Sequence, residues 1–235
     1  MFTGHFAVGF AAKKINPKPS LGTYFLAAQF LDLLWPTLLL LKIETATITS
    51  DSQNAVPILF THYPFSHSLL LVAGWSLLFG GIYYLYRRNY RAALIIGLCV
   101  LSHWILDLLV HVPDLPLYPG SSPLLGFGLW KYKIIALAFE TILFVVGVVI
   151  YLRATTAINK KGLYGTWALI LFLFGIHSMN TFGPPPPSME SVAWVGQMQW
   201  LFVAWAYWID HNRKNRINEI ITVNQPVPGS PVLQA

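Results

Sequence analysis

Apolar segments long enough to cross a bilayer constrain the fold of this chain more than any other feature. A transmembrane helix needs about 20 mostly apolar residues, because its backbone polar groups must be bonded within the segment. Six segments meet this length: Leu21–Leu41, His67–Tyr86, Ala92–His111, Lys133–Leu152, Leu163–Phe182 and Val192–Ile209. A shorter apolar piece, Phe2–Ala12, precedes them and is expected to form a half-length or interfacial helix folded against the others. The predicted fold class is an all-α, polytopic membrane helix bundle with six transmembrane helices and a short N-terminal helix.

The composition indicates one membrane domain that takes up nearly the whole chain. Of its 235 residues, 55% are hydrophobic and 10% are charged, which is unlike a soluble domain. We expect residues 1–212 to form a single transmembrane domain. Residues 213–235 include Gln225–Val232, a Pro-rich stretch that cannot bury a core. This end is predicted to be a disordered cytoplasmic tail.

The basic residues indicate which helix ends face the cytoplasm. They fall in groups at alternate ends of the apolar segments: Lys13, Lys14 and Lys18; Arg87, Arg88 and Arg91; Arg153, Lys160 and Lys161; Arg213, Lys214 and Arg216. The positive-inside rule then places both termini in the cytoplasm. This distribution accounts for the net charge of +6, and no nucleic-acid partner is expected.

Ionisable side chains gather in the predicted outer half of the membrane. A carboxylate at the centre of a span costs roughly 2.5–3.5 kcal/mol on insertion scales, so such a gathering needs a reason. The side chains concerned are Asp32, His67, His103, Asp107, Glu140 and His177, with His111 at the outer mouth of its helix. A functional site is one interpretation. Hydrogen-bonded pairs that fasten helices together are the other, although such bonds are worth only about 0.6 kcal/mol on average.

His103 and Asp107 carry the most specific chemistry. A spacing of four residues puts both on one helical face. Imidazole nitrogen and carboxylate oxygen are common ligands of Zn²⁺ and similar metals. Asp32 and His67 lie at a suitable depth to complete a site. His111, eight residues beyond His103, is too far along the axis to share one ion.

The Ser66-His67 and Ser102-His103 pairs raise the alternative of a serine nucleophile. Adjacent residues on a helix point in different directions. We therefore expect neither serine to be activated by the histidine that follows it, and metal ligation is the preferred interpretation.

At these residues the chain resembles a bacterial inner-membrane family of metal-dependent hydrolases, the YdjM-like family. The resemblance covers about the first 130 residues and rests on four elements: Thr3-Gly4-His5; Phe30-Leu31-Asp32-Leu33-Leu34-Trp35; His62-Tyr63-Pro64-Phe65-Ser66-His67-Ser68; and Ser102-His103-Trp104-Ile105-Leu106-Asp107. It implies metal-binding roles for His5, Asp32, His67, His103 and Asp107, and a location in the bacterial inner (plasma) membrane. The chain departs from the family pattern at Leu34, Trp35 and Tyr63, where the family has an acid, a His and an Arg. We therefore expect a single-metal site or a site without catalysis.

Three functions follow as hypotheses. The first is a membrane-embedded hydrolase that uses a divalent metal, Zn²⁺ first among them, on a lipid-like or phosphoester substrate, with Glu140 or His111 as general base. The second is a proton- or cation-coupled transporter. The third is a membrane assembly protein without catalysis. In each case the lipid bilayer surrounds the chain.

Overall fold

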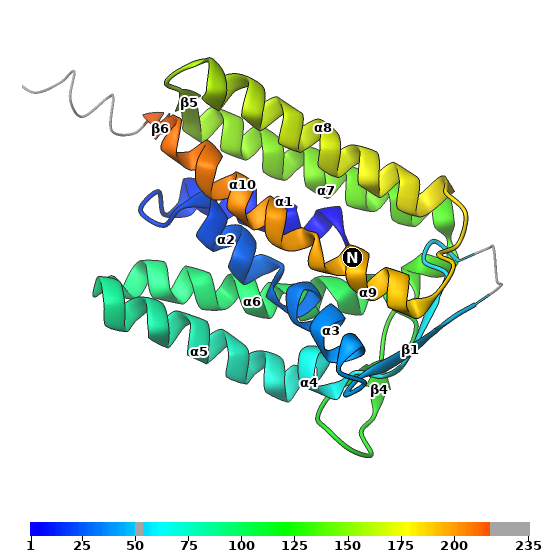
Figure 1. Cartoon of the computed structure of the whole chain (residues 1–235). Coiled ribbons are helices and arrows are strands. Elements are labelled where there is room, and N and C mark those ends of the chain that lie inside the picture. Colours follow the sequence, from blue (N-terminus) through cyan, green and yellow to red (C-terminus); the bar gives the residue numbers. More distant parts are fainter. Residues whose placement is uncertain (50–53, 217–235) are drawn as a thin grey trace, which may run out of the picture.

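Helices make up most of the structure, a computed structural model that describes residues 1–49 and 54–216 (Figure 1). The α-helices are α1 (Thr3–Ile15), α2 (Leu21–Ala28), α3 (Phe30–Leu40), α4 (Pro64–His67), α5 (Leu69–Arg87), α6 (Tyr90–Val110), α7 (Lys133–Ala154), α8 (Lys160–Phe182), α9 (Met189–Gln197) and α10 (Gln199–His211). A short 3-10 helix, η1 (Leu129–Lys131), precedes α7. In Figure 1, α5 and α6 lie side by side at one edge of the bundle and α7 and α8 at the other, with α1, α2 and α10 between them.

Helix α1 is buried in this bundle although it is too short to span a membrane. Its side chains His5, Phe6 and Phe10 are almost fully buried. It packs closely against α7, where a Cβ added to Gly147 would lie 2.5 Å from the carbonyl oxygen of Ala7. The predicted short N-terminal helix folded against the bundle is therefore confirmed.

Among the described residues, four helices are long and apolar enough to cross a membrane, and one bent pair would make a fifth. The four are α5, α6, α7 and α8, and the bent pair is α2 with α3. The sequence predicted six. The difference arises because the first and last apolar segments are each interrupted, at Gln29 and at Met198.

The two interrupted segments pack against each other, α2 against α10 and α3 against α9. The bend between α2 and α3 is 55°. Within α3, Pro36 has no backbone N–H to bond the carbonyl of Asp32. That carbonyl instead accepts a hydrogen bond from Gln199 Nε2 (3.2 Å). Gln199 Oε1 in turn accepts a hydrogen bond from Gln29 Nε2 (3.0 Å), so the Gln29–Gln199 pair joins the two breaks.

Short pairs of antiparallel strands, which the all-α prediction did not include, lie at the ends of some of the helices. The described strands pair as β1 (Thr45–Ile48) with β2 (Ile58–His62), β3 (Leu115–Pro116) with β4 (Leu124–Leu125), and β5 (Thr155–Ala157) with β6 (Arg213–Asn215). Strand β6 contains the first residues of the predicted tail, which are therefore paired with β5 in the fold. Residues 217–235 of the predicted tail lie outside the described residues.

Candidate metal site

Side-chain atoms of three helices form a closed ring of alternating nitrogen and oxygen, here called the donor ring. His103 Nε2 of α6 lies 3.2 Å from Asp107 Oδ2 and 3.6 Å from Asp32 Oδ1. His67 Nε2, from the last residue of α4, lies 3.8 Å from the same Asp107 oxygen and 3.7 Å from the same Asp32 oxygen. Four residues from three separate parts of the sequence therefore converge on one point.

The helical spacing of His103 and Asp107 brings two members of the ring together. They are one turn apart on α6, and their side chains are 0% and 1% exposed. The bend at Gln29 then starts α3 so that Asp32 lies in its first turn, facing α6. The structure thus brings together Asp32, His67, His103 and Asp107, as the sequence predicted, and their role as ligands stays a prediction.

The backbone of α2 fixes the orientation of the His103 ring. His103 Nδ1 lies 2.7 Å from the carbonyl oxygen of Ala28, the last residue of α2. A carbonyl oxygen only accepts, so Nδ1 must carry the proton in this hydrogen bond. In the neutral ring, Nε2 then presents a lone pair to the donor ring.

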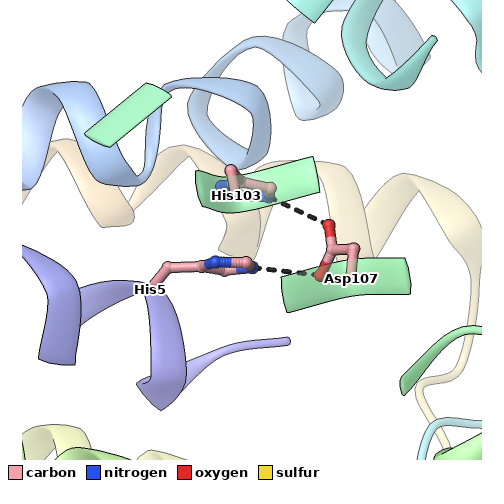
Figure 2. Close-up of side chains that lie close together, drawn as sticks. All are labelled: His5, His103 and Asp107. Carbon is pink, nitrogen blue, oxygen red and sulfur yellow. Dashed lines mark hydrogen bonds and ion pairs between the residues drawn. The ribbon is translucent and has the colours of Figure 1, made fainter. Parts of the chain in front are cut away.

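His5 reaches the site from α1 and contacts the second carboxylate oxygen of Asp107. Figure 2 shows His5 and His103 with their rings parallel and both pointing to Asp107. The ring centroids are 3.5 Å apart, and His5 Nε2 lies 3.1 Å from Asp107 Oδ1. The Met1 amino group lies 2.6 Å from the same oxygen. His5, which only the family resemblance singled out, is thus in contact with two members of the donor ring, His103 and Asp107.

Glu140, the first candidate general base, lies outside the donor ring. Glu140 Oε2 accepts a hydrogen bond from the backbone N–H of Phe2 (3.0 Å) and lies 3.8 Å from His177 Nδ1. Glu140 therefore holds the start of α1, which carries His5. Its role as a base stays a prediction.

His111, the second candidate base, belongs to a separate polar cluster next to the site. Its Nδ1 lies 2.9 Å from Asp114 Oδ1, and Tyr63 donates to the same oxygen at 2.9 Å. Burial and the charge of Asp114 raise the pKa of Tyr63 well above its ordinary value, so the hydroxyl remains a donor. The Tyr63 ring lies between His111 and His67, with ring centroids 6.2 Å and 5.2 Å away.

Ser66 contacts its neighbour His67, contrary to the expectation from helix geometry. Ser66 Oγ lies 2.7 Å from His67 Nδ1 and donates to Glu44 Oε2 at 2.6 Å. The premise that adjacent side chains point apart fails here because α4 is only 4 residues long and His67 is its last residue. That His67 does not activate Ser66 stays a prediction. Glu44 gave no signal in the sequence beyond being an acidic residue in a loop.

The donors fit a small divalent cation. Ligands at about 2.0–2.2 Å from a tetrahedral Zn²⁺ are roughly 3.3–3.6 Å apart, close to the sides of the ring. Two overlapping sets have all their donor atoms within 4.8 Å of one another: His5, His103 and Asp107; and Asp32, His67 and His103. Among the described residues, His103 Nε2 finds no hydrogen-bond partner although it is buried. The nitrogen lone pairs of neutral His67 and His103 would repel the carboxylates of Asp32 and Asp107. The donor ring therefore needs positive charge, either at its centre or on the imidazoles.

The fold and the site together define a helical membrane protein with a buried His/Asp cluster. The chain belongs to the YdjM inner membrane protein family, whose model matches residues 1–183. This match includes all five residues of the expected metal set. No curated protein and no solved structure matches the chain.

Proposed function

We propose that this chain is a membrane-embedded, metal-dependent hydrolase. The observation that carries the proposal is the donor ring, in which two imidazole nitrogens and two carboxylate oxygens face one point. His103 Nε2 has a single lone pair and its Nδ1 is bonded to a carbonyl, so it can serve one ion only. The two overlapping donor sets therefore describe one metal site, with Asp32, His67, His103 and Asp107 as ligands and His5 at its edge.

The metal proposed is Zn²⁺, because mixed His and carboxylate ligands suit it. When bound, such an ion lowers the pKa of a coordinated water toward about 7 and polarises a substrate oxygen. A phosphoester or a lipid-like ester is the substrate class proposed, since the site lies among helices that are apolar enough for a bilayer.

His111 is the better of the two candidate bases. Its Nδ1 donates to Asp114, so Nε2 is left to accept a proton. A carboxylate that orients an imidazole in this way is the usual arrangement for a general base. Glu140 fits the role less well, because its Oε2 accepts the Phe2 amide and so holds the start of α1 outside the donor ring.

The proposed topology has both termini in the cytoplasm and the site in the outer half of the membrane. The four groups of basic residues support it. Cysteine labelling from outside intact cells tests it. A cysteine at exposed Leu59, in the β1–β2 hairpin, is expected to react, and one at exposed Tyr86, near the end of α5, is expected to be protected.

The direct test of the function is metal analysis followed by an activity assay. The purified protein is expected to hold one equivalent of zinc, and His103→Ala is expected to lose both the metal and the hydrolysis of phosphoester substrates. Ser102→Ala is the matched control, because Ser102 Oγ bonds only to the Cys99 carbonyl in the described structure. Equal metal content in the wild type and His103→Ala would reject the proposal.

A second candidate is a cation-coupled transporter, and the paired breaks at Gln29 and Met198 favour it. Interrupted helices beside buried carboxylates are typical of ion sites in transporters. Uptake of a cation into liposomes that depends on Asp32, without hydrolysis, would support this candidate over the hydrolase.

A further inference from the structure

Glu44 is a buried carboxylate in a loop, and among the described residues the hydrogen bonds of its carboxylate lead to one member of the donor ring. It lies between α3 and β1 and is 1% exposed. Its Oε1 accepts the backbone N–H groups of Phe65 (2.7 Å) and Ser66 (2.8 Å), and its Oε2 accepts the Ser66 hydroxyl (2.6 Å). Glu44 thus holds the residues immediately before His67.

The hydrogen bonds that link Glu44, Ser66 and His67 fix which atom donates each proton. A carboxylate accepts only, so the single proton of the Ser66 hydroxyl is committed to Glu44. Ser66 Oγ can then only accept at its other contact, which is His67 Nδ1 at 2.7 Å. His67 Nδ1 therefore carries a proton, and in the neutral imidazole Nε2 presents its lone pair to the donor ring.

We propose that Glu44 is a positioning residue of the metal site, acting through Ser66 to fix the tautomer and orientation of His67. The inference rests on the proposed metal site. It adds to that site a carboxylate from a different part of the chain, the loop before β1. Partners of this kind orient imidazole ligands, and their loss typically weakens metal binding about 10–100-fold.

His103, the other histidine of the donor ring, is oriented by the backbone instead of by side chains. His103 adopts the same tautomer, but its Nδ1 bonds to a backbone carbonyl, which no side-chain substitution removes. His67 depends on two side chains instead. The two histidines therefore have the same tautomer, with the proton on Nδ1. A side-chain substitution at the Nδ1 partner can change the tautomer of His67 but not that of His103.

Glu44→Gln is the decisive variant because the backbone dictates how the new amide lies. The N–H groups of Phe65 and Ser66 need an acceptor, so the amide oxygen must take the place of Oε1. The amide nitrogen then faces Ser66 Oγ and donates to it. The Ser66 proton turns to His67 Nδ1, which moves the ring proton to Nε2 and removes the lone pair from the donor ring.

The experiment measures two properties of the full chain in detergent. The first is the affinity for Zn²⁺ alone, by competition with a chelator, and the second is the ¹⁵N spectrum of the His67 ring in metal-free protein, assigned with His67→Gln. Glu44→Gln is expected to weaken zinc binding about 100-fold and Ser66→Ala about 10-fold, within the range for such partners. Ser66→Thr, which keeps the hydroxyl, is expected to retain wild-type affinity.

The double variant separates the proposal from a merely structural role of Glu44 in holding α4. Without the Ser66 hydroxyl, the new amide at position 44 has no path to His67. E44Q/S66A is therefore expected to bind zinc as Ser66→Ala does, and tighter than Glu44→Gln. A structural role predicts that the two losses add. The matched controls are Glu190→Gln, at an exposed glutamate, and Ser102→Ala, beside the other ring histidine.

The outcomes separate this inference from the proposed function. In metal-free Glu44→Gln, a ring proton on His67 Nε2 supports the inference, and one that stays on Nδ1 overturns it. Additive losses in the double variant also overturn it. A wild-type protein that binds no zinc rejects the proposed function instead, and the tautomer measurement still decides the role of Glu44.

Discussion

The two ends of helix α1 both carry buried ionisable groups, and they differ in how those groups are satisfied. At one end Lys13 Nζ donates to Asp210 (2.9 Å) and to the Pro19 carbonyl (2.8 Å). One cation there meets one anion. At the other end, His5 touches Asp107 beside a ring in which acceptor atoms face one another.

This difference shows that burial of charge does not by itself mark a functional site. A balanced pair such as Lys13–Asp210 needs nothing further, and fastening α1 to α10 is a sufficient account of it. The donor ring has two carboxylates, of which Asp107 meets one cation, the Met1 amino group, and its buried His103 Nε2 has no hydrogen-bond partner among the described residues. It therefore needs further positive charge, which a bound cation would supply. Matched substitutions at the two ends are therefore expected to have different effects.

The largest effect is expected for Asp107→Asn. Asp107 Oδ2 is the ring atom nearest His103 Nε2, and its loss removes a negative ligand. Zinc affinity is expected to fall more than 100-fold, beyond the ~10–100-fold typical of groups that only orient a ligand. Asp210→Asn, the same change at the other end of α1, is expected to keep full zinc content. Equal zinc content in both variants, measured by elemental analysis, would remove the distinction between the two ends.

Lys13→Met is expected to give the opposite result, a loss of stability with zinc binding retained. It removes charge-assisted hydrogen bonds from a side chain that is 4% exposed, which are worth about 1.5–3 kcal/mol. The measurement is thermal unfolding in detergent of zinc-loaded and zinc-free protein. Lys14→Met, at an exposed neighbour, is the control and is expected to leave the unfolding temperature unchanged. Zinc loss in Lys13→Met at full stability would contradict the comparison.

The sequence predicted the donor ring better than it predicted the elements that build it. The spacing of His103 and Asp107 on one apolar helix was sufficient to predict their meeting, because helical geometry fixes it. The predicted membrane depth of Asp32 and His67, in neighbouring segments, indicated that they would join this pair. His5 came from the family resemblance alone, since nothing in the hydropathy of a short helix says where it packs.

The interruptions and the contacts of Ser66 were not predictable from apolar length. Hydropathy gives the length of an apolar segment. It does not predict that two segments are interrupted, or that Gln29 and Gln199 form a hydrogen bond at the interruptions. Pro36, the residue in this segment that disfavours a continuous helix, lies inside α3 and not at the break. The helix-direction rule failed at Ser66 because α4 ends at His67, and the rule applies only within a continuing helix.

Gly147→Ala tests whether close packing of α1 matters to both ends at once. The added Cβ would lie 2.5 Å from the Ala7 carbonyl oxygen and 2.7 Å from its Cα, so α1 or α7 must shift. Overpacking of this kind costs roughly 1–3 kcal/mol, and zinc affinity is expected to fall as His5 moves. Gly81→Ala is the control, because nothing lies within 4 Å of its added Cβ. A shift of α1 without any change in zinc affinity would show that His5 does not contribute to the site.

The smallest effect is expected for Tyr63→Phe, at the cluster between the donor ring and His111. The Tyr63 hydroxyl donates to Asp114, which also bonds His111, so the Asp114 carboxylate has hydrogen-bond partners within this cluster, as Asp210 has at the Lys13 end. Loss of one such hydrogen bond is worth about 0.5–1.5 kcal/mol. The aromatic ring remains, and with it the contact to His67. The unfolding temperature is therefore expected to fall slightly while zinc affinity stays constant. If zinc affinity falls instead, the Tyr63–Asp114–His111 cluster contributes to the metal site. The site would then extend beyond the donor ring and His5.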